Sequence, residues 1–310
     1  MEHELFANPE NVSRGFYDAS TPPILTVKSG DTLRVHTESG LEEHLELIGD
    51  RASDDFRGII EKLPIGPGPH ILVGPIAIEG TSPGDVLEVQ LEDISPRYDW
   101  GYNGFRPLMG GLPEDFPYRR TVIVEIDKKL GVADWGAGIK VPLRPYFGNF
   151  GVAPPPSMGK IGSYPPGAWG GNMDNKELIS GSKVFFPVFN EQALFSIGDG
   201  HGCQGDGEVC LTALECAMSG TLKFKVHKEL SLTLPKAETP THFIFMGFDP
   251  LVDNAVKIAL RETIKFMESE FDIHRDDAYT ICSLAVDLRV TQIVNGVKGV
   301  HAMLPKNIFK

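Results

Sequence analysis

The side chains best suited to chemistry gather in one glycine-rich segment, residues 198–208. Asp199 and His201 are two residues apart, so in an extended backbone both point to the same side, and Asp206 and Glu208 repeat that spacing. Carboxylate oxygens with an imidazole nitrogen suit Zn²⁺ or a similar divalent ion, and three such ligands around an open position would lower the pKa of a bound water. The same pattern also fits a pair of Asp-Gly turns with solvated carboxylates, so both interpretations stay open here.

Cys203 offers a different chemistry in the same segment. It could act as a nucleophile with His201 as its base, although neighbours in sequence need not be within reach of each other in the fold. The spacing from Cys203 to Cys210 fits no Cys-x-x-Cys zinc motif, and Cys210 and Cys216 are typical of small buried side chains.

A second glycine-rich segment, residues 167–175, contains Asn172 and Asp174, which again share one side if the chain is extended. An asparagine side chain offers a donor and an acceptor, which suits an amide substrate. Glycine turns with an Asx cap explain the pattern equally well, and the segment matches neither phosphate-binding glycine motif. His70, between Pro69 and a predicted strand, is either structural or a ligand.

Short strands are expected to position these residues. Residues 24–36 and 71–91 each predict two strands joined by a turn that places Gly-Asp before the second strand. The two segments are weakly similar to each other, but two copies do not establish a repeat. Further strands are predicted at 122–126 and 184–188.

Residues 142–175 are rich in proline and glycine. A loop of this length inside a compact domain is usually functional or disordered. Its aromatic side chains argue against disorder because they need a surface to pack on; they are Tyr146, Phe147, Phe150, Tyr164 and Trp169. We therefore predict an ordered functional loop, which could also mark a subdivision of the chain.

Two helices are predicted late in the chain. Asp249-Pro250 suggests an N-cap followed by proline at the first helical position, and the helical spacing of apolar residues continues to about Glu270. A second helix is predicted from about Asp276 to Leu288, and residues 290–304 predict a closing hairpin around Gly296. The expected fold is α+β and mostly β, with a helical pair near the C-terminus.

Composition narrows the function classes. The 310 residues carry 42 acidic against 29 basic side chains, and the net charge of −13 argues against nucleic acid as a partner. The sequence shows no secretory signal and no run approaching the ~18 apolar residues of a membrane span. The four cysteines are too few for a disulfide framework. We expect one cytoplasmic domain over residues 1–310 that binds neither nucleic acid nor membrane.

Together these motifs resemble the acetamidase/formamidase family, nearer to its acetamidase branch than to the long formamidases. The resemblance covers roughly residues 12–304 and depends most on the two glycine-rich segments. The matching runs are Pro22-Pro23-Ile24-Leu25-Thr26-Val27, Ser29-Gly30-Asp31, His70, Gly84-Asp85-Val86-Leu87, Gly170-Gly171-Asn172-Met173-Asp174, Gly181-Ser182, Phe186-Pro187-Val188, Ala193 to His201, Gln204 to Val209 and Ala285 to Gln292.

This resemblance implies a β-sandwich-like fold and hydrolysis of the C–N bond of small amides, of the formamide or acetamide type, to a carboxylate and ammonia. Metal ions, zinc among them, are associated with the family. We therefore expect a divalent metal, zinc or alternatively calcium, with Asp199, His201 and Glu208 as metal ligands or catalytic residues and Glu208 as the proton acceptor. The expected substrate-binding residues are Asn172, Asp174, Gln204 and His70.

Three alternatives stay open. Some relatives hydrolyse cyclic amides (γ-lactams), so the substrate could be cyclic. The protein could be a metal-independent amidase that uses Cys203, or a non-catalytic β-rich protein in which the glycine motifs cradle a ligand. The resemblance also makes a homo-oligomer the expected state.

Overall fold

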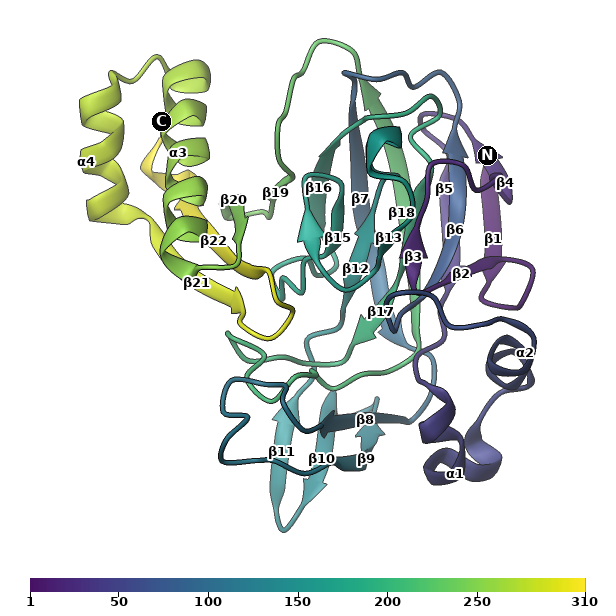
Figure 1. Cartoon of the computed structure of the whole chain (residues 1–310). Coiled ribbons are helices and arrows are strands. Elements are labelled where there is room, and N and C mark those ends of the chain that lie inside the picture. The colour runs from purple at the N-terminus through teal and green to yellow at the C-terminus, as the bar shows by residue number, and fades with distance from the viewer. Residues whose placement is uncertain (310) are drawn as a thin grey trace.

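Two large sheets face each other and form a β-sandwich (Figure 1). The protein is described by a computed structural model that covers residues 1–309. One sheet has nine strands, in the order β1 (Glu2–Phe6), β5 (Thr32–His36), β18 (Met218–His227), β7 (Val86–Pro96), β16 (Ser182–Pro187), β19 (Lys236–Glu238), β20 (His242–Asp249), β22 (Lys298–Pro305), β21 (Asp287–Gln292). The other has seven, in the order β14 (Pro166–Gly167), β15 (Gly170–Asn172), β12 (Tyr146–Gly151), β17 (Phe195–His201), β6 (Ile71–Ile78), β2 (Val12–Arg14), with β4 (Leu25–Val27) parallel to β6.

Aromatic side chains from the two sheets meet in the core between them. The rings of Phe195 on β17 and Phe224 on β18 are 5.4 Å apart, and those of Phe150 on β12 and Phe186 on β16 are 5.6 Å apart. All four side chains are fully buried. Such edge-to-face contacts favour a fixed spacing between the sheets, which holds β12 and β17 rigidly in place.

Smaller elements surround the sandwich. A four-stranded sheet lies at the bottom of Figure 1, with β8 (Trp100–Phe105), β9 (Arg120–Asp127), β10 (Val132–Gly136) and β11 (Ile139–Pro142). A two-stranded sheet pairs β3 (Phe16–Tyr17) with β13 (Ile161–Gly162). Helices α1 (Leu45–Ile48) and α2 (Asp54–Lys62) lie beside the sandwich, with 3₁₀ turns at Glu42–His44, Gly49–Arg51, Pro156–Met158 and Lys306–Ile308.

The predicted helical pair is confirmed as α3 (Val252–Phe271) and α4 (Arg275–Ala285), which pack on one end of the nine-stranded sheet (Figure 1). The predicted start of α3 is wrong by two residues. Asp249 is the last residue of β20 and pairs with Lys298, so its carboxylate instead accepts the Leu251 N–H at 2.8 Å. The second helix also ends earlier than predicted, because the chain turns into β21, which forms the predicted closing hairpin with β22. No helix in residues 1–309 combines the length and apolar character needed to cross a membrane.

The two predicted strand–turn–strand units are present, and each connects the two sheets. β4 and β6 belong to the seven-stranded sheet, whereas β5 and β7, which follow them, belong to the nine-stranded one. In both turns the aspartate accepts the N–H three residues earlier, Asp31 from Lys28 at 2.9 Å and Asp85 from Ser82 at 2.7 Å. The two similar segments of the sequence therefore make the same connection, from a strand of one sheet to a strand of the other.

The prediction of a long loop over 142–175 is wrong. The segment contains β12, β13, β14 and β15, and β12 is a fully buried strand near the middle of its sheet. Glycine and aromatic residues are mixed along β12. This composition does not predict a strand, because glycine normally weakens strands. Here the glycines let other groups approach the backbone, and the aromatic rings fill the sandwich core. The fold class, α+β and mostly β, is confirmed.

Candidate active site

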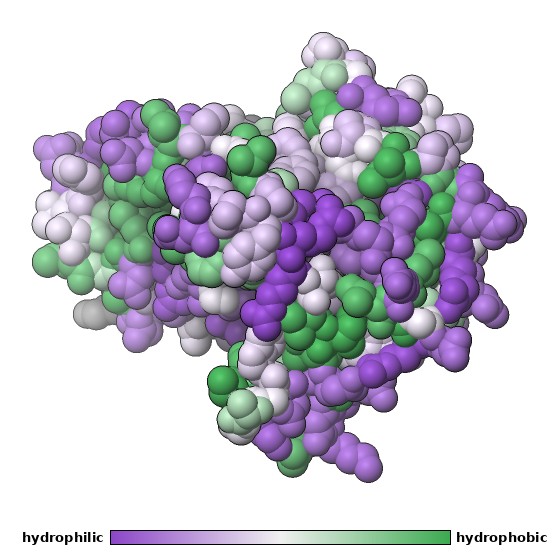
Figure 2. Space-filling model, turned by 60° about the horizontal axis from the view of Figure 1, so that its bottom comes forward, coloured by the Kyte–Doolittle hydropathy of each residue, from purple (hydrophilic) through white to green (hydrophobic). Residues whose placement is uncertain are grey.

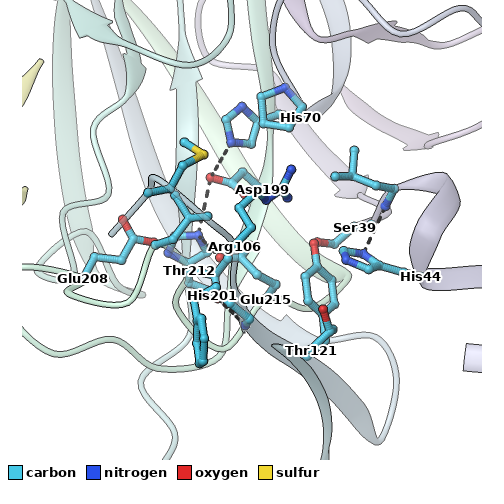
Figure 3. A pocket seen from close by; sticks show the side chains of 18 of the residues that line it. Ser39, His44, His70, Arg106, Thr121, Asp199, His201, Glu208, Thr212 and Glu215 are labelled. Atoms are coloured by element: carbon cyan, nitrogen blue, oxygen red, sulfur yellow. Dashed lines mark hydrogen bonds and ion pairs between the residues drawn. The ribbon is translucent and has the colours of Figure 1, made fainter. Parts of the chain in front are cut away.

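Asp199 and His201 lie on the same face of β17, as their spacing predicts. The Asp199 Oδ2 and His201 Nε2 atoms are 3.4 Å apart, and both side chains are buried (Figure 3). β17 is hydrogen-bonded on one side to β12 and on the other to β6. A strand held on both edges fixes the pair more precisely than a loop would.

Glu215 completes the centre of the site, and the sequence analysis did not single it out. Its Oε1 lies 3.3 Å from His201 Nε2, and its backbone bridges to both His201 and Tyr102 of β8. The available signal was a lone carboxylate within the apolar run Leu211 to Met218. A buried charge in such a run needs a partner, and His201 is that partner here.

Asp174 and Glu208 lie around the same imidazole. Two overlapping groups have ligand atoms within 4.8 Å of one another and could hold a metal ion: Asp174 with Asp199 and His201, and His201 with Glu208 and Glu215. Asp174 Oδ2 accepts a hydrogen bond from Asn295 at 2.6 Å, but Asp174 Oδ1 and Glu208 Oε2 are buried without a partner. Buried oxygens without partners are costly, so these two are candidates for binding an ion or a substrate.

The backbone is strained at three of these positions. Asp174, Asp199 and Glu208 have φ angles of 49°, 56° and 47°, in the left-handed region that residues other than glycine seldom adopt. Strain of this kind persists only where the surrounding structure imposes it, and it clusters at functional sites.

The four carboxylates do not titrate alike. Burial raises the pKa of Asp174 and of Glu208 well above the usual range, and neighbouring carboxylates add to the shift. Burial, with the charge of Asp199, raises the pKa of Glu215 to about 6. Burial also acts against ionisation of Asp199, but the neighbouring His70 and His201 imidazoles, which favour the carboxylate when they carry a proton, outweigh it and lower the pKa of Asp199. The site can therefore hold and release protons near neutral pH.

The other face of the His201 ring is held by Gln204 and Tyr146. The Tyr146 hydroxyl donates to Gln204 Oε1 and lies 2.8 Å from His201 Nδ1, which is also 3.1 Å from Gln204 Oε1. Gln204 Nε2 donates to the carbonyl oxygens of Asp174 and Thr291, at 2.9 and 3.2 Å, which fixes the orientation of its amide. Nδ1 therefore carries a proton, and Nε2 faces the carboxylates. Burial acts against a charge on this imidazole, but the carboxylates of Glu215 and Asp199 outweigh it and raise the pKa of His201 well above its usual range.

His70 approaches Asp199 from the other side, with its Nε2 3.7 Å from Asp199 Oδ2 (Figure 3). Its Nδ1 lies 2.8 Å from Ser163 Oγ and 3.1 Å from Asn149 Nδ2, an amide nitrogen that can only donate. The Asn149 amide is oriented by donating to the Ser163 carbonyl at 2.7 Å. The two hydrogens of this amide are shared among three acceptors, so the Ser163 hydroxyl, which accepts from the His70 backbone N–H at 3.4 Å, is the main donor to Nδ1 and leaves the ring proton on Nε2. Burial lowers the pKa of His70, which favours this neutral form.

His70, His201 and the four carboxylates line a cavity of about 110 Å³. The wall also includes Asn172, whose Oδ1 accepts from Asn149 Nδ2 at 3.1 Å. The outer part has polar residues from the 3₁₀ turn at Glu42–His44 and from the segment after β8, together with apolar ones. A cavity of this size fits a small molecule rather than a polymer.

Gly148 makes room for the site. It lies on β12, and a Cβ there would be 2.6 Å from Asp174 Oδ1, 2.7 Å from Asp199 Oδ2 and 2.8 Å from His201 Cε1. Contacts this short do not occur in proteins, so the space beside Gly148 is part of the cluster's geometry.

The remaining sequence candidates lie elsewhere. Gln204 is behind the His201 ring, and Asp206, which repeats the spacing with Glu208, is part-exposed and pairs with Lys176 at 2.9 Å. Cys203 lines a second cavity of about 660 Å³, on the other side of Glu208. Burial raises the pKa of the Cys203 thiol, which favours the unreactive protonated form.

Comparison with known proteins gives one consistent result. A family model described as the Acetamidase/Formamidase family matches residues 6–162 and 160–310. An acetamidase from Mycolicibacterium smegmatis is 27% identical over 246 residues, a match that spans 61% of this chain and 59% of that relative's length.

Two solved structures are similar over nearly the whole chain. A predicted acetamidase/formamidase from Thermoanaerobacter tengcongensis has a TM-score of 0.88 at 28% identity, covering 99% of this chain and 97% of that one. An acetamidase from Bacillus halodurans has a TM-score of 0.84 at 30% identity, covering 98% of each chain.

Proposed function

The chain belongs to the acetamidase/formamidase family, and on that premise we propose that it hydrolyses the C–N bond of small amides to a carboxylate and ammonia. The observation that carries the proposal is the buried cluster at the end of the small cavity. Asp199 and Glu215 lie within 3.4 Å of His201 Nε2, and Glu208 and Asp174 add two carboxyl groups with oxygens that have no partner. Such a cluster can bind a polar reacting centre and move protons around it.

We further propose that the cluster holds a divalent ion. His201 belongs to both candidate ligand groups, one with Asp174 and Asp199 and the other with Glu208 and Glu215. Asp199 and Glu215 lie nearest to its Nε2, at 3.4 and 3.3 Å. One nitrogen and several carboxylate oxygens suit zinc, whereas calcium would prefer oxygen alone. When bound, such an ion supplies a positive charge that polarises the amide carbonyl and lowers the pKa of a water.

Two histidines then have distinct roles. Gln204 and Tyr146 hold the proton of His201 on Nδ1 and direct its Nε2 to the carboxylates. His70 keeps its proton on Nε2, next to Asp199, so it can donate to the amide oxygen as negative charge develops there. Ser163 and Asn149 are positioning residues for that donor.

Glu208 is the proposed proton carrier. Its pKa is raised by burial, and one of its oxygens has no partner, so it can take a proton from water and pass it to the leaving nitrogen. Asn172 accepts from Asn149 through its Oδ1, which leaves its amide NH₂ for the substrate. Asp174, held by Asn295, forms the wall beside it.

Ammonia release from formamide and acetamide tests this proposal. Asp199→Asn and His201→Asn are expected to lower kcat by about 10²-fold or more, since each removes a group at the reacting centre. Asp206→Asn is the matched control, because Asp206 lies in the same segment but pairs with Lys176 outside the cluster. Unchanged turnover in Asp199→Asn would contradict the proposal.

The rival functions predict different results in the same assay. Ring opening of a γ-lactam without ammonia release from open amides would identify a lactam hydrolase. Loss of activity on thiol alkylation, with none on chelation, would identify the Cys203 mechanism. Tight binding of amides without turnover would identify a ligand-binding protein.

We also propose a homo-oligomer in a reducing compartment such as the cytoplasm. Figure 2 brings the end with the four-stranded sheet forward and shows apolar side chains among hydrophilic ones. Trp135, Ile139 and Val141 on β10 and β11 are each at least 40% exposed, which favours a protein contact there. All four cysteines are unpaired. Light scattering of the purified protein tests the oligomer.

A further inference from the structure

The cavity contains a cationic side chain that the proposed hydrolysis does not use. Arg106 follows β8 directly and lines the same cavity as Asp199 and His201 (Figure 3). Its Nη2 is 3.7 Å from Glu43, a carboxylate that binds Arg119 more closely, at 2.6 Å. The Arg106 side chain is 34% exposed and, among residues 1–309, has no shorter ion pair. Its guanidinium therefore has donors available to a ligand in the cavity.

The Tyr164 hydroxyl is a second donor available in this cavity. Tyr164 lines the cavity, and its ring is 6.5 Å from that of His70. Within the described residues its hydroxyl donates only to the Met109 sulfur, at 3.7 Å, a weak acceptor. Burial raises the pKa of Tyr164 to about 12, and the charges of Arg106 and Glu208 both act on it. Tyr164 thus keeps its proton and can donate it to a ligand close to both groups.

The cavity wall therefore carries groups of both charges. Its wall includes four carboxyl groups around His201 and, in addition, the Arg106 guanidinium and the Tyr164 hydroxyl. A neutral alkyl chain gains nothing from a guanidinium, whereas a carboxylate forms a charge-assisted, often bidentate, hydrogen bond with it. The small volume, about 110 Å³, requires the two ends of such a ligand to be only a few bonds apart.

We infer that the substrate is an amide whose acyl part carries a carboxylate a few bonds from the amide carbon. Arg106 and Tyr164 bind that carboxylate, and the amide lies at Asp199 and His201. The inference rests on the proposed amidase function and names its substrate class. The bond that breaks is unchanged, and the products are a dicarboxylate and ammonia.

Succinamate and its neutral isostere 4-methylpentanamide test the inference. In the wild type, kcat/KM for succinamate is expected to exceed that for the isostere by at least about tenfold. Arg106→Gln should lower the succinamate value by about ten- to a hundredfold and leave the isostere within about twofold. Arg120→Gln is the charge-matched control: this exposed arginine on β9 lies over Trp135, 5.9 Å from its ring, and its loss should change neither value.

The outcomes separate this inference from the general proposal. Equal values for the two amides in the wild type, or equal losses in Arg106→Gln, would overturn it. Hydrolysis of formamide or acetamide with no preference for succinamate would reject the substrate class and keep the amidase. If no amide is hydrolysed, calorimetric titration with succinamate decides: Arg106-dependent binding supports the carboxylate subsite, and binding that is absent or unaffected by Arg106→Gln refutes it.

Discussion

Replacing Gly148 with alanine places a methyl group inside the cluster. That methyl would lie 2.6 Å from Asp174 Oδ1 and 2.7 Å from Asp199 Oδ2, where ordinary contacts start at 3.4 Å. Relief requires movements of roughly 0.7–0.8 Å, yet Asn295 binds Asp174 at 2.6 Å and Asp199 belongs to a strand paired on both edges. A misplacement approaching 1 Å costs about 10²-fold in rate, and overpacking costs about 1–3 kcal/mol.

The assay is ammonia release, with urea unfolding to measure the free energy of unfolding of the same preparations. Gly148→Ala should remain folded, lose about 1–3 kcal/mol and lose about 10²-fold in kcat. Gly205→Ala is the control, because a Cβ at 205 meets no atom within 4 Å; we expect a change within about 0.5 kcal/mol and near-normal kcat. A folded Gly148→Ala protein with wild-type kcat would refute the argument that this gap is part of the site.

Three further changes probe other parts of the account. Glu215→Gln should lower the amount of bound metal and should lower kcat by about 10²-fold. If the variant kept the metal content and the rate of ammonia release of the wild type, Glu215 would be excluded as a ligand. Ser163→Ala removes a donor to His70 Nδ1 and should lower kcat about tenfold with little change in KM; a KM effect alone would count against His70 as an oxyanion donor. Burial lowers the pKa of His301 to about 4. As the pH falls, this histidine therefore takes up a proton in the unfolded chain before it does so in the folded protein. The free energy of unfolding should consequently drop by about 2 kcal/mol between pH 7 and pH 5. In His301→Asn, urea unfolding should show that drop reduced by the same amount, and an unchanged drop would be inconsistent with this assignment.

The parts of the fold that follow local patterns were predictable from the sequence. Alternation predicted β4 and β7, and apolar spacing predicted α3, because each pattern reflects burial of one face. β12 was not predicted because contacts with distant parts of the chain determine its residues. A side chain at Gly148 would clash with Asp174 and Asp199, which are distant in sequence.

The candidate active site was also predictable only where its residues follow a local pattern. Asp199 and His201 were predictable as a pair because both lie on one strand, and period two places them together. Glu215 was not, because its position depends on a backbone bridge to His201 that no local pattern encodes. Gln204 was predicted to bind the substrate but lies behind the His201 ring, since spacing alone does not distinguish a residue behind the ring from one in the cavity.

Elemental analysis of the protein as purified tests the central claim most directly, namely that the cluster around His201 holds an ion for amide hydrolysis. We predict about one divalent ion per chain in a preparation that releases ammonia from acetamide, and loss of that ion in His201→Asn. A wild-type preparation free of divalent metal that hydrolyses acetamide at full rate would contradict it.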